Sequence, residues 1–380
     1  SPLAALILSV FIGALFIGGG SGPPPARLAE GEALAARYCA NCHTLPAPPQ
    51  LSAEEWPYLL AWMGNYLGHP AEIPITPTLV DKKLVPTPPL VSRDELKRIA
   101  EYFIHTSTTA YQPPPPLPVA APAHLFEPVP LPIPATVISM VAIDETDQTL
   151  AVGTSEPQPD LLILRRGQTS SIRMTSEPAA YERRGAFRRV SLLGYLAFDG
   201  GRGEVIDLDL ATETRQVLVS GHPRIAHHRT VDLDGDGSED LLICGFGDFG
   251  TGRIGIWWGG TDPLKEQVLS VEGGAVWGDA ADFDGDGDLD LVFSIGNARP
   301  RLLAFVNEGE RRFTPRAIVE RPVGWGYNRG AVVDWDGDGR PDLVELAGNN
   351  LELRGRPLKP HHGVRVLRNE GGWQFREILF

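Results

Sequence analysis

The chain has 380 residues, a length that suggests two folded units joined by connecting segments and not one large core. Its 42 glycines and 35 prolines favour turns and short strands over long helices, so we expect a β-rich protein. The formal net charge of −14 argues against a nucleic-acid partner, because such a protein needs a basic surface that displaces counterions from phosphate.

Residues 1–20 contain no charged side chain and are mostly apolar. That length is just enough for a helix that crosses the hydrocarbon core of a membrane. The alternative is a cleavable signal sequence, although neither a basic segment before the apolar run nor a small-residue cleavage site after it is present. We expect residues 1–20 to be a transmembrane anchor or a signal.

Helix-forming patterns predict a small all-α domain over residues 21–111. Ser92 and Glu95 form a capping-box pattern before the clearest amphipathic segment. Pro57 fits only the first turn of the helix that it enters. The helices are expected at residues 26–37, 56–68 and 93–105.

The segment Cys39-Ala40-Asn41-Cys42-His43 has the spacing C-x-x-C-H. Two thiols one helical turn apart can each add to a vinyl group of haem, and the adjacent imidazole then ligates the iron. A zinc site would need a second pair of ligands, and a thioredoxin-like motif would need a βαβ pattern around it; neither is seen in the sequence. Cys39, Cys42 and His43 are therefore predicted to bind one covalent haem c.

Cys244, in an apolar run, is expected to be a buried hydrophobe.

Residues 26–110 resemble the class I cytochrome c domain. The resemblance rests on Gly31 and Leu34 before the haem motif, on the motif itself, and on Tyr102 in the last predicted helix. In that family two helices near the ends of the domain carry these positions. The resemblance implies a monohaem c-type cytochrome.

The same family uses a downstream methionine as the sixth iron ligand, and Met63 is the only methionine in this segment. The resemblance thus implies His43 and Met63 as the axial ligands, with His69 and His105 as rivals to Met63. Met63 lies nearer to the haem motif than the ligand of mitochondrial-type cytochromes does. A His/Met pair closes both axial positions, which suits electron transfer and not substrate binding.

Residues 112–135 are predicted to be a proline-rich linker. Ten prolines between Gln112 and Pro134 exclude both a helix and the interior of a sheet. As polyproline II the segment would be a semi-rigid spacer, and the alternative is a strap that lies along a domain surface.

Residues 136–380 show short β-branched runs broken by Gly, Asp and Asn. Three acidic loops begin at Asp232, Asp282 and Asp334, which are 50 and 52 residues apart. This period fits the four strands of one propeller blade. Weaker echoes at 141–153 and 196–208 bring the number of repeats to five. The segment is predicted to be an all-β propeller.

The three acidic loops share the pattern D-x-D-G-D-G-x-x-D. Aspartates at positions 1, 3, 5 and 9 offer the oxygen ligands that Ca²⁺ prefers, and carboxylates about 4 Å apart repel each other by about 1 kcal/mol in water when no cation is present. The alternative is a set of solvated acidic turns. About three calcium ions are expected. The predicted ligands are Asp232, Asp234, Asp236 and Asp240, then Asp282, Asp284, Asp286 and Asp290, then Asp334, Asp336, Asp338 and Asp342.

These repeats are similar to the FG-GAP/VCBS repeats of integrin-like β-propellers, and Gly245-Phe246-Gly247 follows the first loop in a suitable place. The resemblance implies that the calcium loops are structural and not catalytic. Most members have seven blades, so either this propeller closes with five or the sequence is incomplete.

The combined features predict an electron-transfer protein at the bacterial inner membrane, anchored by the N-terminal helix and facing the periplasm. The propeller would be a docking scaffold in a membrane redox complex with redox protein partners, and no enzymatic activity of its own is expected. The alternatives are a quinoprotein-like dehydrogenase with a fused cytochrome, and an adhesion or carbohydrate-binding module. His227-His228 and His361-His362 are the only groups that suggest an enzyme, and we expect them to face solvent.

Overall fold

The computed structural model forms two compact units, a helical unit and a β unit. The residues that it describes are 22–41, 45–73, 76–81, 83, 85–107, 130, 131, 133, 135, 137–194, 201–247, 252–261, 263–296, 299–322, 324–348 and 361–379.

The predicted fold class is wrong. The described chain is mostly β, a five-bladed propeller with few helices, and no all-α cytochrome c domain is evident in it. Within the same residues, no helix is long and apolar enough to cross a membrane. The predicted anchor at 1–20 and most of the predicted linker at 112–135 lie outside the described residues.

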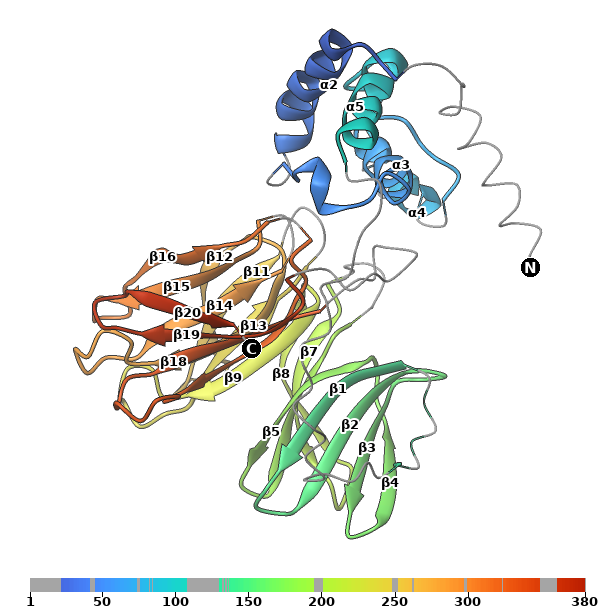
Figure 1. The fold of residues 1–380 in the computed structure, drawn as a ribbon. Coiled ribbons are helices and arrows are strands. Elements are labelled where there is room, and N and C mark those ends of the chain that lie inside the picture. The colour runs from blue at the N-terminus through green and yellow to red at the C-terminus, as the bar shows by residue number, and fades with distance from the viewer. Residues whose placement is uncertain are drawn as a thin grey trace. The chain divides into compact units, whose positions relative to one another are not determined.

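Four short α-helices and two 3₁₀ turns make up the described helical unit (Figure 1). They are α2 (Pro25–Tyr38), η1 (Cys39–Asn41), η2 (Pro48–Gln50), α3 (Trp56–Tyr66), α4 (Thr76–Asp81) and α5 (Arg93–Thr106). The predicted capping box is confirmed: Glu95 N donates to Ser92 Oγ at 3.2 Å, and Ser92 N donates to Glu95 Oε2 at 2.7 Å. Pro57 lies in the first turn of α3, as its fixed φ requires.

Helices α2 and α5 cross at Gly31, where the backbones come close together. A Cβ atom at this position would lie 2.3 Å from Arg98 O and 2.8 Å from Tyr102 Cβ, so only glycine fits. Behind this crossing the rings of Trp56 and Phe103 pack with their centroids 4.4 Å apart. The helical unit therefore has a small aromatic core of its own.

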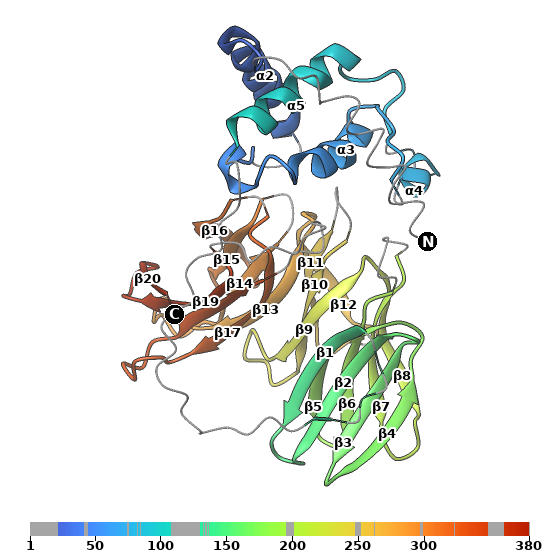
Figure 2. The ribbon, with the colours of Figure 1, turned by 45° about the vertical axis from the view of Figure 1, so that its right-hand side comes forward.

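The β unit contains five four-stranded antiparallel sheets, each formed by strands that are consecutive in the chain (Figures 1 and 2). Blade 1 comprises β1 (Val137–Asp144), β2 (Thr149–Glu156), β3 (Asp160–Arg165) and β4 (Gln168–Arg173). Blade 2 comprises β5 (Pro178–Arg184), β6 (Phe187–Leu192), β7 (Gly203–Asp209) and β8 (Arg215–His222). Blade 3 comprises β9 (Ile225–Val231), β10 (Asp240–Gly245), β11 (Arg253–Trp258) and β12 (Lys265–Ser270). Blade 4 comprises β13 (Ala275–Ala281), β14 (Asp290–Ile295), β15 (Arg301–Asn307) and β16 (Phe313–Glu320). Blade 5 comprises β17 (Tyr327–Val333), β18 (Asp342–Ala347), β19 (Gly363–Asn369) and β20 (Phe375–Leu379).

The first strands of successive blades adjoin one another, so that β5 lies beside β1, β9 beside β5, β13 beside β9 and β17 beside β13.

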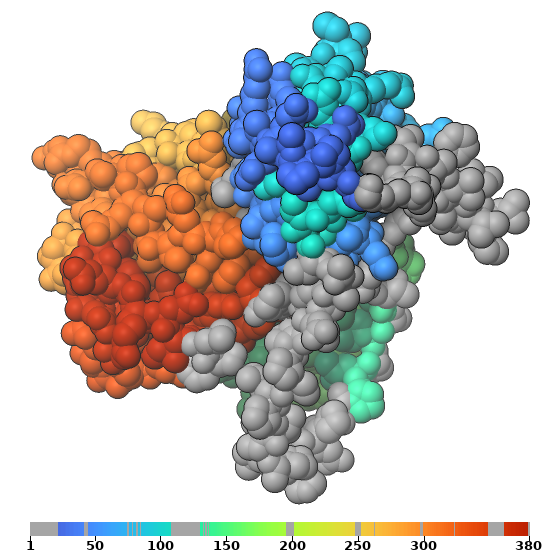
Figure 3. All heavy atoms as spheres, turned by 45° about the horizontal axis from the view of Figure 1, so that its top comes forward, coloured from blue at the N-terminus to red at the C-terminus, as the bar shows by residue number. Residues whose placement is uncertain are grey.

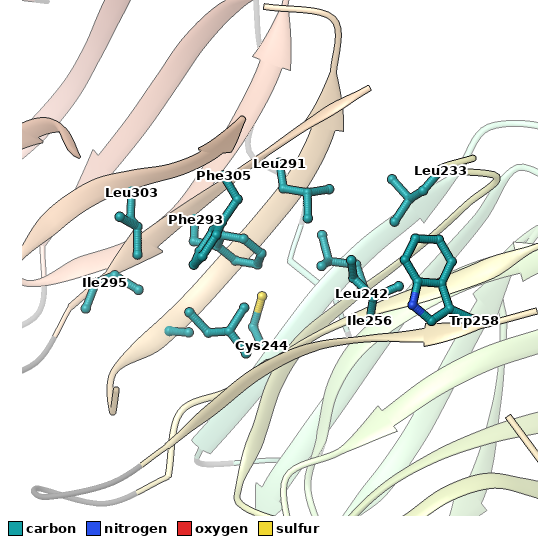
Figure 4. Close-up of a cluster of buried hydrophobic side chains, with 12 residues drawn as sticks. Leu233, Leu242, Cys244, Ile256, Trp258, Leu291, Phe293, Ile295, Leu303 and Phe305 are labelled. Carbon is teal, nitrogen blue, oxygen red and sulfur yellow. The ribbon is translucent and has the colours of Figure 1, made fainter. Parts of the chain in front are cut away.

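The large apolar clusters fill the spaces between neighbouring blades. One of them joins Leu242 and Ile256 of blade 3 to Phe293 and Phe305 of blade 4 (Figure 4). Cys244 is fully buried in this cluster. In the space-filling view, blades 4 and 5 form one continuous surface in orange and red (Figure 3).

The acidic loops connect the first and second strands of blades 3, 4 and 5, and the predicted echo at 141–153 is the same connection in blade 1. The second echo is out of register. Residues 205–208 lie in β7, the third strand of blade 2, and residues 196–200 lie outside the described residues. The true equivalent in blade 2 is the turn between β5 and β6, which the sequence did not reveal because it holds no aspartate.

Candidate metal centres

Each acidic loop is a tight turn that its glycines make possible. In the first loop, Gly235 and Gly237 have φ values of 70° and 85°, and a Cβ atom at either position would meet nothing within 4 Å. Glycine is therefore favoured here by the positive φ of the backbone and not by a lack of room for a side chain. The N–H of Gly237 donates to Asp232 Oδ2 at 3.0 Å, and the equivalent bonds in the other two loops have the same length.

The aspartates at positions 1, 3 and 9 converge in all three loops. In each group one oxygen from every carboxylate lies within 4.8 Å of the others. The groups are Asp232, Asp234 and Asp240, then Asp282, Asp284 and Asp290, then Asp334, Asp336 and Asp342. The structure thus brings together nine of the twelve predicted ligands.

The aspartates at position 5 are absent from these described groups. Each of them accepts a hydrogen bond from the backbone N–H two residues later, which holds the tip of the loop. Asp236 Oδ1 accepts from Ser238 N at 2.7 Å, and Asp286 and Asp338 make the equivalent bonds at 2.9 Å. Spacing alone could not distinguish this role from that of a ligand.

The aspartate at position 9 is the best anchored member of each group. Asp290 is 1% exposed, and its two oxygens accept from Phe283 N at 3.1 Å and Asn307 N at 2.8 Å. Burial raises the pKa of Asp290 to about 6, with a smaller contribution from Asp284 and Asp286, and burial also raises the pKa of Asp240. A bound cation would stabilise the ionised carboxylates. The oxygen-only donor set fits a hard divalent cation such as Ca²⁺.

Two hairpins, which the sequence analysis missed, each lie against one of these loops. Each hairpin joins the third and fourth strands of the blade that follows the loop. Arg311 of blade 4 donates from Nε to Asp234 Oδ2 of blade 3 at 2.7 Å, and Trp373 of blade 5 donates from Nε1 to Asp284 Oδ2 of blade 4 at 3.1 Å. The repeated pattern N-E-G-x-x-x-F at residues 307–313 and 369–375 could have indicated the equivalence of the two hairpins.

Of the predicted haem ligands, the structure describes Cys39 and Met63, while Cys42 and His43 lie outside the described residues. Cys39 begins η1 directly after α2, is half-buried, and packs against the apolar cluster that contains Trp56 and Phe103. Met63 is half-buried in α3.

The rival axial ligands occupy different surroundings. His69 Nε2 lies 2.7 Å from Val91 O, so the ring is already engaged with the backbone. His105 is exposed in the last turn of α5.

The expectation that His227 and His228 face solvent is wrong. They lie in β9, where His227 is 5% exposed and His228 is fully buried, because blades cover this sheet on both faces. His228 Nδ1 lies 2.5 Å from Ser191 Oγ. Burial lowers the pKa of His228 to about 4 and lowers that of His227 well below its ordinary value, so both rings are neutral near pH 7. His361 and His362 are half-buried, and the ring of His361 stacks on Trp325 at 4.6 Å.

Residues 232–293 and 282–345 match the model of the FG-GAP-like repeat. The chain therefore contains FG-GAP-like repeats within a five-bladed β-propeller. No curated protein matches the chain.

Among solved structures, the chain is similar to an auxiliary nutrient binding protein from Bacteroides thetaiotaomicron, with 12% identity and a TM-score of 0.44 over 65% of this chain and 57% of that one. It is also similar to the N-terminal domain of Nup159, with 11% identity and a TM-score of 0.36 over 64% of this chain and 62% of that one. The matches thus span less than two thirds of either relative. These likenesses are too distant to indicate a function.

Proposed function

We propose that this protein carries electrons through one haem c that Cys39 and Cys42 bind covalently. The observation that carries the proposal is the segment Cys39-Ala40-Asn41-Cys42-His43. Haem supplies one-electron redox chemistry when bound, and the chain would hold it by two thioether bonds and by the imidazole of His43. The proposal rests on this donor set and not on a cytochrome c fold.

The surroundings of Cys39 support this donor set. The residue packs against the apolar cluster behind the crossing of α2 and α5, which includes Trp56, Ile99 and Phe103. An apolar wall beside the attachment point limits access of water, and solvent access is one of the properties that set the redox potential of a metal centre.

Met63 is proposed as the second axial ligand. Its thioether is half-buried in α3, whereas His69 would have to give up its contact with Val91 O and His105 is exposed. Met63→Ala should abolish the weak sulfur-to-iron absorption band of the oxidised protein and leave the covalent haem in place. If the band is unchanged, Met63 is not the ligand.

The central experiment is a haem stain after denaturing electrophoresis of protein made in a host with a c-type maturation system. The band of the full chain should stain, and the double variant Cys39→Ala with Cys42→Ala should not. Cys244→Ala is the matched control, because this thiol is buried in the propeller and should not affect haem attachment. Removal of the haem from the wild-type chain by acid acetone would refute the proposal.

We further propose that the three acidic loops bind calcium and thereby make the propeller rigid. The rigid propeller would serve as a docking surface for a redox protein partner on the periplasmic side of the bacterial inner membrane. Calcium sites in extracellular modules have dissociation constants of about 10⁻⁴ to 10⁻³ M, so loops of this kind suit an exported protein. Isothermal calorimetry of the full chain should give about three sites in this range. A heat of binding that does not differ from buffer would refute the calcium proposal.

A carbohydrate-binding or adhesion module is the second candidate function. A cavity of about 570 Å³ beside the second loop is lined by carboxylates together with Trp373 and Arg316. An indole beside carboxylates and a calcium site is a set of groups that can hold a sugar by stacking and hydrogen bonds. Calcium-dependent retention on an immobilised glycan array, lost in Trp373→Ala, would favour this function over docking of a redox partner.

A further inference from the structure

The three loops differ in the positive charge that surrounds them. The loop at 282–290 holds five aspartates, and no lysine or arginine of the described chain lies within ion-pairing distance of any of them. Its neighbour from blade 5 is the neutral indole of Trp373, whose Nε1 donates to Asp284 Oδ2 at 3.1 Å. Within the described chain, the carboxylates of this loop therefore have no ion-paired basic side chain. Arg316 lines the same cavity, with its guanidinium carbon 5.9 Å from the centroid of the Trp373 ring.

The loop at 232–240 has a guanidinium against its ligand groups. Arg311 Nε donates to Asp234 Oδ2, and Arg311 Nη2 lies 3.7 Å from Asp236 Oδ2. The guanidinium also lies over the ring of Trp258, 4.1 Å from its centroid, which keeps it beside the loop. Arg311 thus partly neutralises the same carboxylate that converges with Asp232 and Asp240.

The third loop also has basic neighbours, although they come from its own blade. Arg368 Nη1 lies 3.3 Å from Asp336 Oδ2. Arg340 forms an ion pair with Asp338. Among the described residues, the loop at 282–290 is the one of the three whose aspartates form no ion pair with a basic side chain.

Arg311 and Trp373 are equivalent positions of the two interblade hairpins. Each is the fifth residue of the N-E-G-x-x-x-F pattern, and each has a φ of 61°. The hairpins hold the same backbone geometry, because Asn307 and Asn369 each accept the N–H of the glycine two residues later, at 3.0 and 2.9 Å. One side chain at a fixed position therefore determines whether a positive charge or a neutral ring lies against the preceding loop.

We propose that the three loops bind divalent cations with graded affinity, that the loop at 282–290 fills first, and that Arg311 lowers the affinity of the loop at 232–240. This inference rests on the proposed calcium binding. The affinity of an oxygen cage depends on the net charge of its ligands, and a resident guanidinium repels the incoming cation and competes with it for Asp234. Since Arg311 is partly exposed, its effect on affinity is expected to be about five- to tenfold.

The test is a titration of the full chain with Tb³⁺, which occupies calcium sites and emits when a nearby indole is excited. The first equivalent should give strong emission, because Trp373 contacts Asp284 directly. Trp373→Phe should remove most of the emission of that first equivalent while the number of bound ions, counted by competition with Ca²⁺, stays the same. Emission that persists in Trp373→Phe would show that another loop fills first and would overturn the ranking.

The role of Arg311 is tested by a matched pair of variants. Arg311→Gln should raise the affinity of one of the weaker sites about five- to tenfold, whereas Arg312→Gln should change no site by more than about twofold, because Arg312 pairs with Glu310 and not with the loop. Trp373→Arg, which gives the second hairpin the residue of the first, should weaken the tightest site by a similar factor. Equal effects of Arg311→Gln and Arg312→Gln would overturn the role of Arg311.

Failure of the inference can be distinguished from failure of the calcium proposal. If neither Tb³⁺ nor Ca²⁺ binds to the folded wild-type chain, the calcium proposal fails and the grading fails with it. If about three ions bind with one common affinity, calcium binding stands and only the grading is refuted.

Discussion

The side-chain amide of Asn369 donates to the carbonyl of Phe283 at 2.9 Å and thereby joins blade 5 to the acidic loop of blade 4. Asn369 is fully buried, and its backbone N–H also donates to Asp342 Oδ1 at 2.7 Å. The equivalent residue, Asn307, donates its amide to Leu289 of its own blade. Asn307 and Asn369 occupy the same position of the repeat. Of the two, Asn369 bonds to a neighbouring blade, whereas Asn307 bonds within its own blade.

We expect Asn369→Ala to lower the free energy of unfolding by about 1–3 kcal/mol, because it leaves a buried carbonyl of the neighbouring blade without its donor. The measurement is chemical unfolding of the full chain in calcium-containing buffer. Asn307→Ala is the control for loss of the amide within one blade. A smaller loss in Asn369→Ala than in Asn307→Ala would show that the bond to Phe283 adds nothing to stability.

The propeller should lose stability in mild acid because of His228. The folded-state pKa of this histidine is about 4 and its ordinary value is 6.5, so between these pH values the unfolded chain binds a proton that the folded chain does not. Stability due to this residue is complete above pH 6.5 and is lost as the pH falls toward 4. At pH 5 the loss is about 2 kcal/mol for a single group.

This pH dependence can be measured as the free energy of unfolding at pH 7.5 and pH 5 with calcium held constant. His228→Asn should reduce the difference between the two values by about 2 kcal/mol. His105→Asn, in α5 of the helical unit, is the control for loss of a histidine outside the propeller. If both variants keep the wild-type difference, the acid sensitivity comes from other groups.

Calcium should raise the melting temperature of the propeller. A ligand that binds only the folded state contributes RT ln(1 + [L]/Kd), which at 10 mM calcium and a Kd of 10⁻⁴ to 10⁻³ M is about 1.4–2.7 kcal/mol for each site. Asp284→Ala should remove most of the contribution of one site. Asp288→Asn is its control, since Asp288 does not belong to a converging group. The haem spectrum should be the same with and without EDTA, because the haem ligands belong to the helical unit.

The helical unit should not tolerate a side chain at Gly31. A Cβ atom there would lie 2.3 Å from Arg98 O, a backbone atom that cannot move without separating α2 and α5. We expect Gly31→Ala to destabilise this unit by about 3 kcal/mol, at the upper end of the usual cost of overpacking. Gly64→Ala is the control, because the nearest atom would lie at 3.5 Å, and alanine in helix α3 should stabilise by about 0.5–1 kcal/mol. The melting of the helical signal distinguishes the two variants.

The sequence predicted those features that depend on local chemistry. The capping box of Ser92 and Glu95 defines the start of α5, and the aspartate pattern marks the turn between first and second strands in three blades, because both are recognised within a few residues. The pattern could not show which aspartates converge. Asp236 has the same spacing as a ligand, yet its carboxylate is not among the three that converge in this loop.

Features that depend on packing between distant segments could not be predicted. His227 and His228 are adjacent in a strand, and alternation would place one of them in solvent. Both are buried because neighbouring blades cover the two faces of the sheet. The contact of Arg311 with Asp234 joins residues 77 positions apart, so no local pattern indicates it.

The apolar clusters between blades imply that no blade of the propeller is a folding unit in its own right. Phe293 of blade 4 packs in a cluster with Leu242 of blade 3, and Val292 of the same strand packs in another cluster with Leu343 of blade 5. A single blade cut out of the chain would expose one or both of these surfaces and would lack a closed core. The smallest fragment that folds alone is therefore a run of several blades. A chain end placed inside this run would expose an apolar blade surface that favours aggregation, even where the cut falls in a loop.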